Sequence, residues 1–280
     1  MEAMTLVQAC RAYVETSSRA AKLRPRAPSL PEAPPPRERV QEVSWKPGRS
    51  ARLEVVARAP RAPRPGALKD PSARAHLLHV FLHHEIQAAE LSAWAIAAFP
   101  ETPAPFRDGL ARILTDEARH ARSYAARLRS LGARYGDFPV RDWFWERVPS
   151  CRTPRMYTAL MGLGFEAGNL EHAERFEGAL RAAGDEESAE VVRVVGQEEV
   201  AHVRFAAQWF VKLGGKAAAD GGPDYTAWES ELPPPITPAL LQGRPLAKVA
   251  RRRAGLGEEF LSSLEAAGGN GATSRRSHRR

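Results

Sequence analysis

The spacing of apolar side chains predicts four long helices between residues 70 and 215. Through each of them, hydrophobic positions recur every three or four residues, which is the repeat of a helix that buries one face. The four expected helices span residues 71–98, 103–131, 154–182 and 185–213.

The ends of these segments carry residues that start and stop helices. An acidic or hydroxyl side chain can accept hydrogen bonds from the free backbone N–H groups of a first turn, and proline suits the first helical position. Glycine ends a helix because it readily adopts a left-handed conformation. The expected N-caps are Asp70, Thr102, Thr153 and Asp185, and the expected stops are Pro100, Gly132, Gly184 and Gly214.

The connections between the helices indicate the fold. The first two helices are joined by a short link, and so are the last two, so each pair should form an antiparallel hairpin. The link over residues 132–153 is long, and its segment 142–145 could form a short helix. One long crossover between two helical hairpins is the connectivity of a ferritin-like four-helix bundle. The sequence therefore predicts an all-α fold of this type.

The segments outside residues 70–215 differ from this core. Residues 1–69 contain a short helix near 4–22 and then an extended arm, 24–66, rich in proline, arginine and alanine. Residues 216–267 form a C-terminal extension that should pack on the bundle and include a short helix near 257–266. Residues 268–280 have the composition of a disordered basic tail.

The chain has 280 residues and a formal net charge of +8, but the excess of positive charge lies in the flanks. Residues 1–71 carry +7 and residues 213–280 carry +3, whereas residues 72–212 carry −2. Basic runs such as Arg251–Arg253 could contact phosphates, although solvated termini are the more common explanation. No apolar stretch is long enough for a membrane span and no signal-peptide core is present, so we expect a cytoplasmic protein.

Two Glu-x-x-His pairs carry the candidate chemistry. Glu117 precedes His120 by three residues, and Glu199 precedes His202 by three. Side chains three apart share a helix face, so each pair could bind one metal ion. A further glutamate lies 32 residues before Glu117, at Glu85, and another lies 33 residues before Glu199, at Glu166.

The placement of these six residues supports one common site. Each of the four glutamates lies near the middle of its expected helix, and its neighbours three, four and seven positions away are mostly apolar. Burying four carboxylates without cations would be costly, and two divalent ions would compensate them. Oxygen-rich ligands with one imidazole per metal favour iron or manganese.

Other residues near the motifs were assigned roles by position. Asp116 and Glu198 could accept a hydrogen bond from a metal-bound histidine, since such histidines usually donate to a carboxylate. Tyr124 lies on the same face as Glu117, as a core residue or a redox tyrosine. Glu90 and Glu171 lie five residues after the upstream glutamates, about 140° off the ligand face. We therefore expect them at the rim or flank of the site, with metal ligation as the alternative.

Four segments of the chain support a resemblance to a known family: LLHVFLHHEIQAAEL, TDEARHARSYAARLRSLGARYGD, GFEAGNLEHA and GQEEVAHVRFAAQWF. They resemble a bacterial ferritin-like family described by a domain of unknown function, which is related in pattern to the di-iron hydroxylases that modify tRNA. The chain departs from the usual pattern in having Glu198 where an aspartate is usual. It also has Gly168, Asn169 and Glu171 in a motif that usually reads Glu-Ala-Arg-Gly-Leu-Asp.

The resemblance implies a di-iron carboxylate enzyme that uses O2 to oxidise or hydroxylate a small organic substrate. Glu85, Glu117 and His120 would hold one iron, Glu166, Glu199 and His202 the other, with Glu117 and Glu199 bridging. A di-manganese or mixed iron–manganese pair is an alternative. So are an iron-oxidising or storage protein, a tRNA-modifying hydroxylase and a metal-free helical interaction module. We expect a monomer or homodimer without membrane contact.

Overall fold

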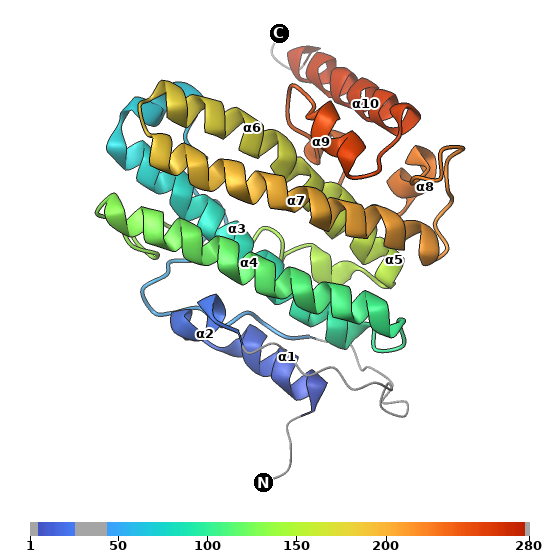
Figure 1. Cartoon of the computed structure of the whole chain (residues 1–280), viewed down its shortest axis with the longest axis horizontal. Helices are drawn as coiled ribbons and strands as arrows, with labels where there is room; N and C mark the ends of the chain where they lie inside the picture. The colour runs from blue at the N-terminus through green and yellow to red at the C-terminus, as the bar shows by residue number, and fades with distance from the viewer. Residues whose placement is uncertain (1–4, 26–43, 278–280) are drawn as a thin grey trace. The chain divides into compact units, whose positions relative to one another are not determined.

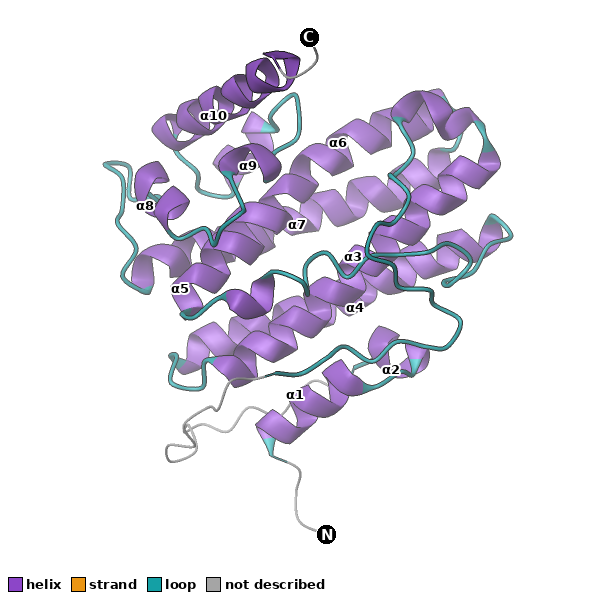
Figure 2. Ribbon diagram, turned by 180° about the vertical axis from the view of Figure 1, so that it is seen from behind, coloured by secondary structure: helices purple, strands orange, loops and turns teal. Residues whose placement is uncertain are grey.

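The computed structural model describes the backbone of residues 5–25 and 44–277, and side chains as far as residue 268. The described part of the chain is all-helical (Figure 2) and contains no β-strand. Its only extended pairings are isolated bridges, Val55 with Val140 and Ala217 with Pro223. The predicted all-α class is therefore confirmed.

The long helices lie close to their predicted positions (Figure 1). Helix α3 spans Pro71–Ala98, α4 spans Ala104–Ser130 and α7 spans Glu186–Lys212. The third expected helix consists of three consecutive segments, and the middle one is a π-helix, which hydrophobic spacing cannot distinguish from an α-helix. These segments are α5 (Pro154–Tyr157), the π-helix η3 (Thr158–Glu166) and α6 (Ala167–Ala182).

Three of the four predicted N-caps form. Asp70 accepts a hydrogen bond from the Ser72 N–H at 2.9 Å, Thr153 from Met156 at 3.1 Å and Asp185 from Ser188 at 3.0 Å. The cap predicted at Thr102 is wrong, because its hydroxyl donates instead to the Phe99 carbonyl at 2.7 Å and Pro103 takes the cap position.

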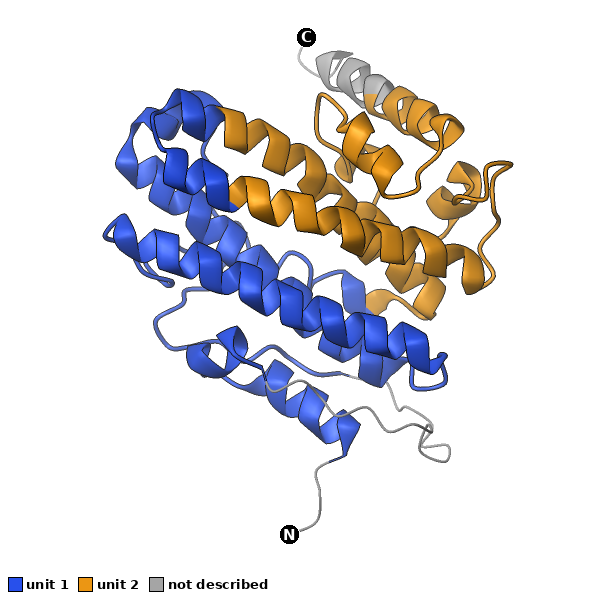
Figure 3. Cartoon of the chain, in the orientation of Figure 1, with its two compact units in different colours: residues 1–149, 179–191 blue, residues 150–178, 192–280 orange. Residues whose placement is uncertain are grey.

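Two compact units make up the chain, and each is described separately (Figure 3). The first comprises residues 1–149 and 179–191. Its central element is the hairpin of α3 and α4, covered by α1 (Leu6–Glu15) on α3 and by α2 (Arg19–Leu23) on α4. Covered from several sides, α3 has almost no exposed face beyond its first turn, which explains why it is apolar around most of its circumference.

The described part of the arm is ordered against the first unit. The Gly48 N–H donates to the Val14 carbonyl at 2.9 Å, and the Val56 N–H donates to the Val140 carbonyl at 2.8 Å. A short 3₁₀ helix, η1 (Pro65–Lys69), then leads into α3. Residues 26–43 of the predicted arm lie outside the described part of the chain.

The second unit comprises residues 150–178 and 192–280. Its helices approach closely through small residues on both sides. A Cβ at Gly162 would lie 2.2 Å from the Ala206 Cβ, and one at Gly196 would lie 2.4 Å from the Ala173 Cβ. These distances show that both glycines allow close helix packing.

The C-terminal extension packs on the η3 and α6 segments of the second unit. Trp228 is fully buried and donates through Nε1 to the Ala159 carbonyl at 3.0 Å. A Cβ at Gly164 would meet the side chain of Leu241 at 3.0 Å. The helical elements of the extension are α8 (Tyr225–Ser230), η4 (Pro238–Leu240), α9 (Lys248–Arg253) and α10 (Glu258–Ser277).

Two local expectations differ from the structure. Helix α10 continues to Ser277, into the stretch expected to be disordered from residue 268, because no proline interrupts a helix already begun by residues 258–267. Residues 142–145 lie in turns rather than a short helix, followed by the 3₁₀ segment η2 (Val148–Ser150). Within the described ranges, no helix combines the length and hydropathy that crossing a bilayer requires.

Candidate metal centre

In the first unit, three predicted ligands converge in the interior of the α3–α4 hairpin. Glu85 of α3 and Glu117 and His120 of α4 are 5%, 0% and 1% exposed. The His120 Nδ1 atom lies 3.3 Å from the Glu85 Oε2 atom and 3.6 Å from the Glu117 Oε2 atom. One imidazole nitrogen thus faces an oxygen from each of two carboxylates, and the Glu-x-x-His spacing places His120 and Glu117 on the same helix face.

The second unit contains a triad of the same composition. Glu166 is the last residue of η3, and Glu199 and His202 belong to α7; all three are buried. The His202 Nδ1 atom lies 3.0 Å from the Glu199 Oε2 atom. The Asn169 side-chain amide donates to the Glu166 Oε2 atom at 3.3 Å, so the asparagine that departs from the family pattern contacts a predicted ligand directly.

Three of the six predicted ligands form one compact group within the first unit. Candidate ligand atoms from Glu85, Glu117 and His120 all lie within 4.8 Å of one another, and all three side chains are buried. Two oxygen or nitrogen ligands of one ion, each about 2.1 Å from it, are separated by at most about 4.2 Å, so small side-chain adjustments would suffice. This buried carboxylate and histidine cluster could therefore hold metal ions.

The donor set indicates which metals fit. Carboxylate oxygens with imidazole nitrogen, and no thiolate, suit iron or manganese better than the cysteine-rich sites preferred by structural zinc. Removing several carboxylates from water costs several kcal/mol each, and a cation among them would offset that cost. The Nδ1 atoms of His120 and His202 face carboxylate oxygens, so Nδ1 is the nitrogen placed for coordination.

The three residues predicted to support the ligands, Asp116, Glu198 and Tyr124, differ in how far they are buried. Asp116 accepts a hydrogen bond from the Arg119 Nη2 atom at 2.8 Å, and its side chain is 40% exposed. Glu198 is half-buried. Tyr124 is buried, with its ring centroid 5.6 Å from that of Phe81, as expected of a core tyrosine. The roles of Asp116 and Glu198 toward the histidines stay predictions.

Glu90, expected at the rim or flank of the site, is part of a buried charge cluster. Its side chain is fully buried and lies 2.7 Å from the Lys22 Nζ atom and 2.6 Å from the Arg49 Nη1 atom. The Trp145 Nε1–H donates to it at 2.7 Å. Burial alone would raise the pKa of Glu90, but Arg49 and Lys22 more than offset burial and hold the pKa below its usual value. Glu90 lies on a different face of α3 from Glu85. The arm covers that face through Arg49.

Glu171 is the equivalent residue of the second unit, and it too is buried. The Arg251 guanidinium binds it through two hydrogen bonds of 2.7 and 2.8 Å, and the Gly243 and Ala247 N–H groups also donate to it. Arg251 is itself 0% exposed, so the solvated basic run expected at 251–253 is wrong for its first member. Both carboxylates are bound by cations, which argues against the alternative that they ligate metal.

The long crossover contributes a buried hydrogen-bonded chain that the sequence did not indicate. The His83 Nδ1 atom lies 2.6 Å from the Tyr135 hydroxyl, and its Nε2 atom lies 3.1 Å from the Asp142 Oδ1 atom. Asp142 also accepts from Arg49, at 2.9 Å from Nη2. No local motif marks such a chain, because its members are brought together only by the path of residues 132–145 over α3.

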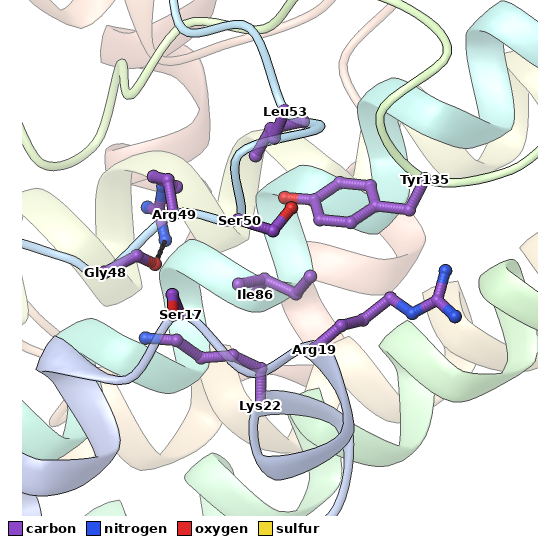
Figure 4. Close-up of a pocket in the computed structure, with 9 residues that line it drawn as sticks. All are labelled: Ser17, Arg19, Lys22, Gly48, Arg49, Ser50, Leu53, Ile86 and Tyr135. Carbon is purple, nitrogen blue, oxygen red and sulfur yellow. Dashed lines mark hydrogen bonds between the residues drawn. The ribbon is translucent and has the colours of Figure 1, made fainter.

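A small pocket lies beside this network, where the arm and α2 meet α3 (Figure 4). It has room for little more than a water molecule, which excludes it as the binding site of an organic substrate. Its lining consists of Ser17, Arg19, Lys22, Gly48, Arg49, Ser50, Leu53, Ile86 and Tyr135.

A protein-family model described as "Protein of unknown function (DUF455)" matches residues 5–262. The match covers most of the chain, which therefore belongs to this family. No curated protein and no solved structure matches the chain.

Proposed function

We propose that this protein is a non-haem di-iron carboxylate oxidase or oxygenase that uses O2 to oxidise or hydroxylate a small organic substrate. The observation that carries the proposal is the buried group formed by Glu85, Glu117 and His120 in the first unit, matched in composition by the buried Glu166, Glu199 and His202 in the second. Four-helix proteins that bind two metal ions use this ligand chemistry, with Glu-x-x-His motifs on two helices and single glutamates on two others.

The proposal assigns one metal ion to each triad. Glu85, Glu117 and His120 would hold the first ion, and a second set of Glu166, Glu199 and His202 would hold the other, with Glu117 and Glu199 bridging. Support comes from the equal composition of the triads and from the carboxylate oxygen that faces each histidine Nδ1 atom. The ferritin-like bundle is part of the same proposal, because its connectivity would bring four central glutamates together.

The chain's own residues would prepare the site in three ways. The glutamates would compensate the charge of the ions in an interior that excludes bulk water, since all of them are at most 5% exposed. Asp116 and Glu198 would orient the histidines by accepting their second ring N–H. Asn169 would fix the Glu166 carboxylate through its hydrogen bond. Bound iron would supply the redox chemistry that no amino-acid side chain here provides.

The test is anaerobic loading of the full-length protein with ferrous iron, followed by elemental analysis and measurement of O2 uptake. We expect two tightly bound iron ions per chain, and O2 consumption that depends on them. His120→Ala and His202→Ala should each lower the stoichiometry towards one. Glu259→Gln, an exposed carboxylate in α10, is the matched control and should leave it at two.

The outcome also separates the alternatives. No bound metal after loading, in a protein whose helical content is intact, would refute the proposal and favour a helical interaction module. Iron far beyond two per chain together with a large native mass would support storage. Two bound irons without any O2 uptake would refute oxygen chemistry while leaving the metal site in place.

A further inference from the structure

The segment of the arm between Val56 and η1 presents an uncompensated row of arginines. Arg58, Arg61 and Arg64 are all exposed, and each lies three positions after the one before it. Among the described residues none of the three side chains has an ion-pair or hydrogen-bond partner, in contrast to Arg49 and Arg52 on the same arm.

Prolines restrain the backbone of this segment, which follows a bend at residues 57–58. Its sequence, Ala57-Arg-Ala-Pro-Arg-Ala-Pro-Arg-Pro65, contains Pro60, Pro63 and Pro65. Proline fixes its own φ and disfavours the helical region for the residue before it. Arg64 has φ −75° and ψ 154°, which is the polyproline II conformation. In a polyproline II helix, which has three residues per turn, side chains three positions apart lie along one edge, about 9 Å apart.

Both ends of the segment are anchored in the first unit. At one end Val56 is hydrogen-bonded to Val140 at 2.8 Å. At the other end Leu68 is fully buried and its carbonyl accepts from the Arg74 Nη1 atom at 2.9 Å. An anchored, proline-restrained row loses less conformational entropy on binding than a flexible basic tail would.

We propose that the row Arg58, Arg61 and Arg64 is a binding surface for the phosphodiester backbone of a nucleic acid. Guanidinium groups bind phosphate oxygens through paired, charge-assisted hydrogen bonds, and a regular cationic row matches a repeating anion. The row contains no aromatic side chain to stack on bases, so binding is independent of sequence. An anionic membrane is the weaker match, because only alanine and proline separate the arginines and nothing large and apolar is available for insertion.

This surface is independent of the metal ligands. The three arginines lie on the arm, whereas the candidate ligands lie on α3, α4, η3 and α7, so the two proposals can fail separately. Three of the arginines that make the N-terminal flank basic would thus have a binding role.

The experiment measures binding of the full-length protein to fluorescently labelled single-stranded RNA and duplex DNA of mixed sequence by anisotropy, over a series of salt concentrations. The test variant replaces the three arginines together (R58Q/R61Q/R64Q). We expect the slope of log K against log salt to become shallower by about 2 to 3, since each lost phosphate contact removes a little less than one. Affinity at low salt should fall at least about tenfold.

A control variant with the same change in charge removes three exposed arginines elsewhere (R112Q/R129Q/R244Q). It should retain the wild-type slope to within about 1. Equal losses in both variants would overturn the proposal, because the effect would then be one of net charge alone. Absence of binding at low salt would also overturn it, as would binding of the row to vesicles of anionic phospholipid in preference to either nucleic acid.

Discussion

Replacing Glu90 by glutamine tests whether the arm is bound to the first unit by a buried charge cluster. The substitution keeps the size of the side chain but removes its charge. It leaves Lys22 and Arg49, whose side chains are 5% and 12% exposed, with Asp142 as the remaining counter-charge of the cluster. The glutamine also replaces one carboxylate oxygen by an NH2 group, which cannot accept a hydrogen bond from Lys22 or Arg49.

The magnitude follows from the burial of the cluster. Breaking a buried ion pair by removing one partner costs about 3–5 kcal/mol, because the remaining charge is left uncompensated out of water. Glu90 is fully buried and both cations are nearly so, so solvent screening reduces this figure little. For a protein of this size the loss corresponds to a fall in Tm of roughly 6–20 °C.

Thermal and urea unfolding followed by circular dichroism would measure the loss at pH 7. Glu15→Gln, which removes an exposed helical pair with Arg11, is the control and should change stability by less than about 0.5 kcal/mol. The double variant Glu90→Gln with Lys22→Met should recover part of the loss, because Arg49 and Asp142 then balance each other.

The pH dependence gives a second check with a definite sign. The pKa of Glu90 is held low in the folded state, so its contribution is present above the ordinary carboxyl pKa and is lost as the pH falls through the folded value. The difference between the wild type and Glu90→Gln should therefore shrink in strong acid. A variant as stable as the wild type at pH 7, or a difference that grows in acid, would show that the cluster does not stabilise the fold as reasoned here.

Two further predictions concern helix packing and a buried histidine. Gly162→Ala should destabilise the second unit by at least about 1–3 kcal/mol, because its Cβ would lie 2.2 Å from the Ala206 Cβ. Gly178→Ala is the control: its Cβ would meet nothing within 4 Å, so it should be neutral or stabilising by up to about 1 kcal/mol. Urea unfolding of both variants decides this, and equal effects would contradict the close packing. Burial lowers the pKa of His79 to about 4, and its Nε2 atom accepts from the Gly136 N–H at 2.8 Å. The unfolded state therefore takes up a proton first, and stability should fall by about 2 kcal/mol between pH 8 and pH 5 through this residue. Urea titrations at both pH values should show that fall reduced in His79→Gln; an unchanged pH dependence would mean that His79 is not held neutral.

The sequence predicted most of the helical framework because the necessary signals are local. Capping residues such as Asp70 and Thr153 and the stop at Gly132 act within a few residues, and hydrophobic spacing acts along one helix. The π-helical segment was missed, because residues 159–165 within it are all apolar or glycine and give no register.

In the candidate site too, contacts among the motif residues were predicted, whereas contacts with the flanking segments were not. The Glu-x-x-His spacing places Glu117 and His120 together whatever the tertiary structure, and the position of Glu85 at mid-helix was sufficient to associate it with them. The partners of Glu90 and Glu171 could not be found from the sequence, because Arg49 and Arg251 are 41 and 80 residues away. Only the folded path of the flanks determines such pairings.

The positions of Glu90 and Glu171 bear on which fragment of this chain can be produced as an independent module. Each lies five residues after an upstream candidate ligand, and each receives its arginine from a segment outside residues 70–215. A fragment limited to residues 70–215 would lack Arg49 and Arg251, so both carboxylates would be buried without a counter-ion. The flanks are therefore integral to the architecture, and truncation at either terminus would remove a counter-ion from a helix that carries a candidate ligand.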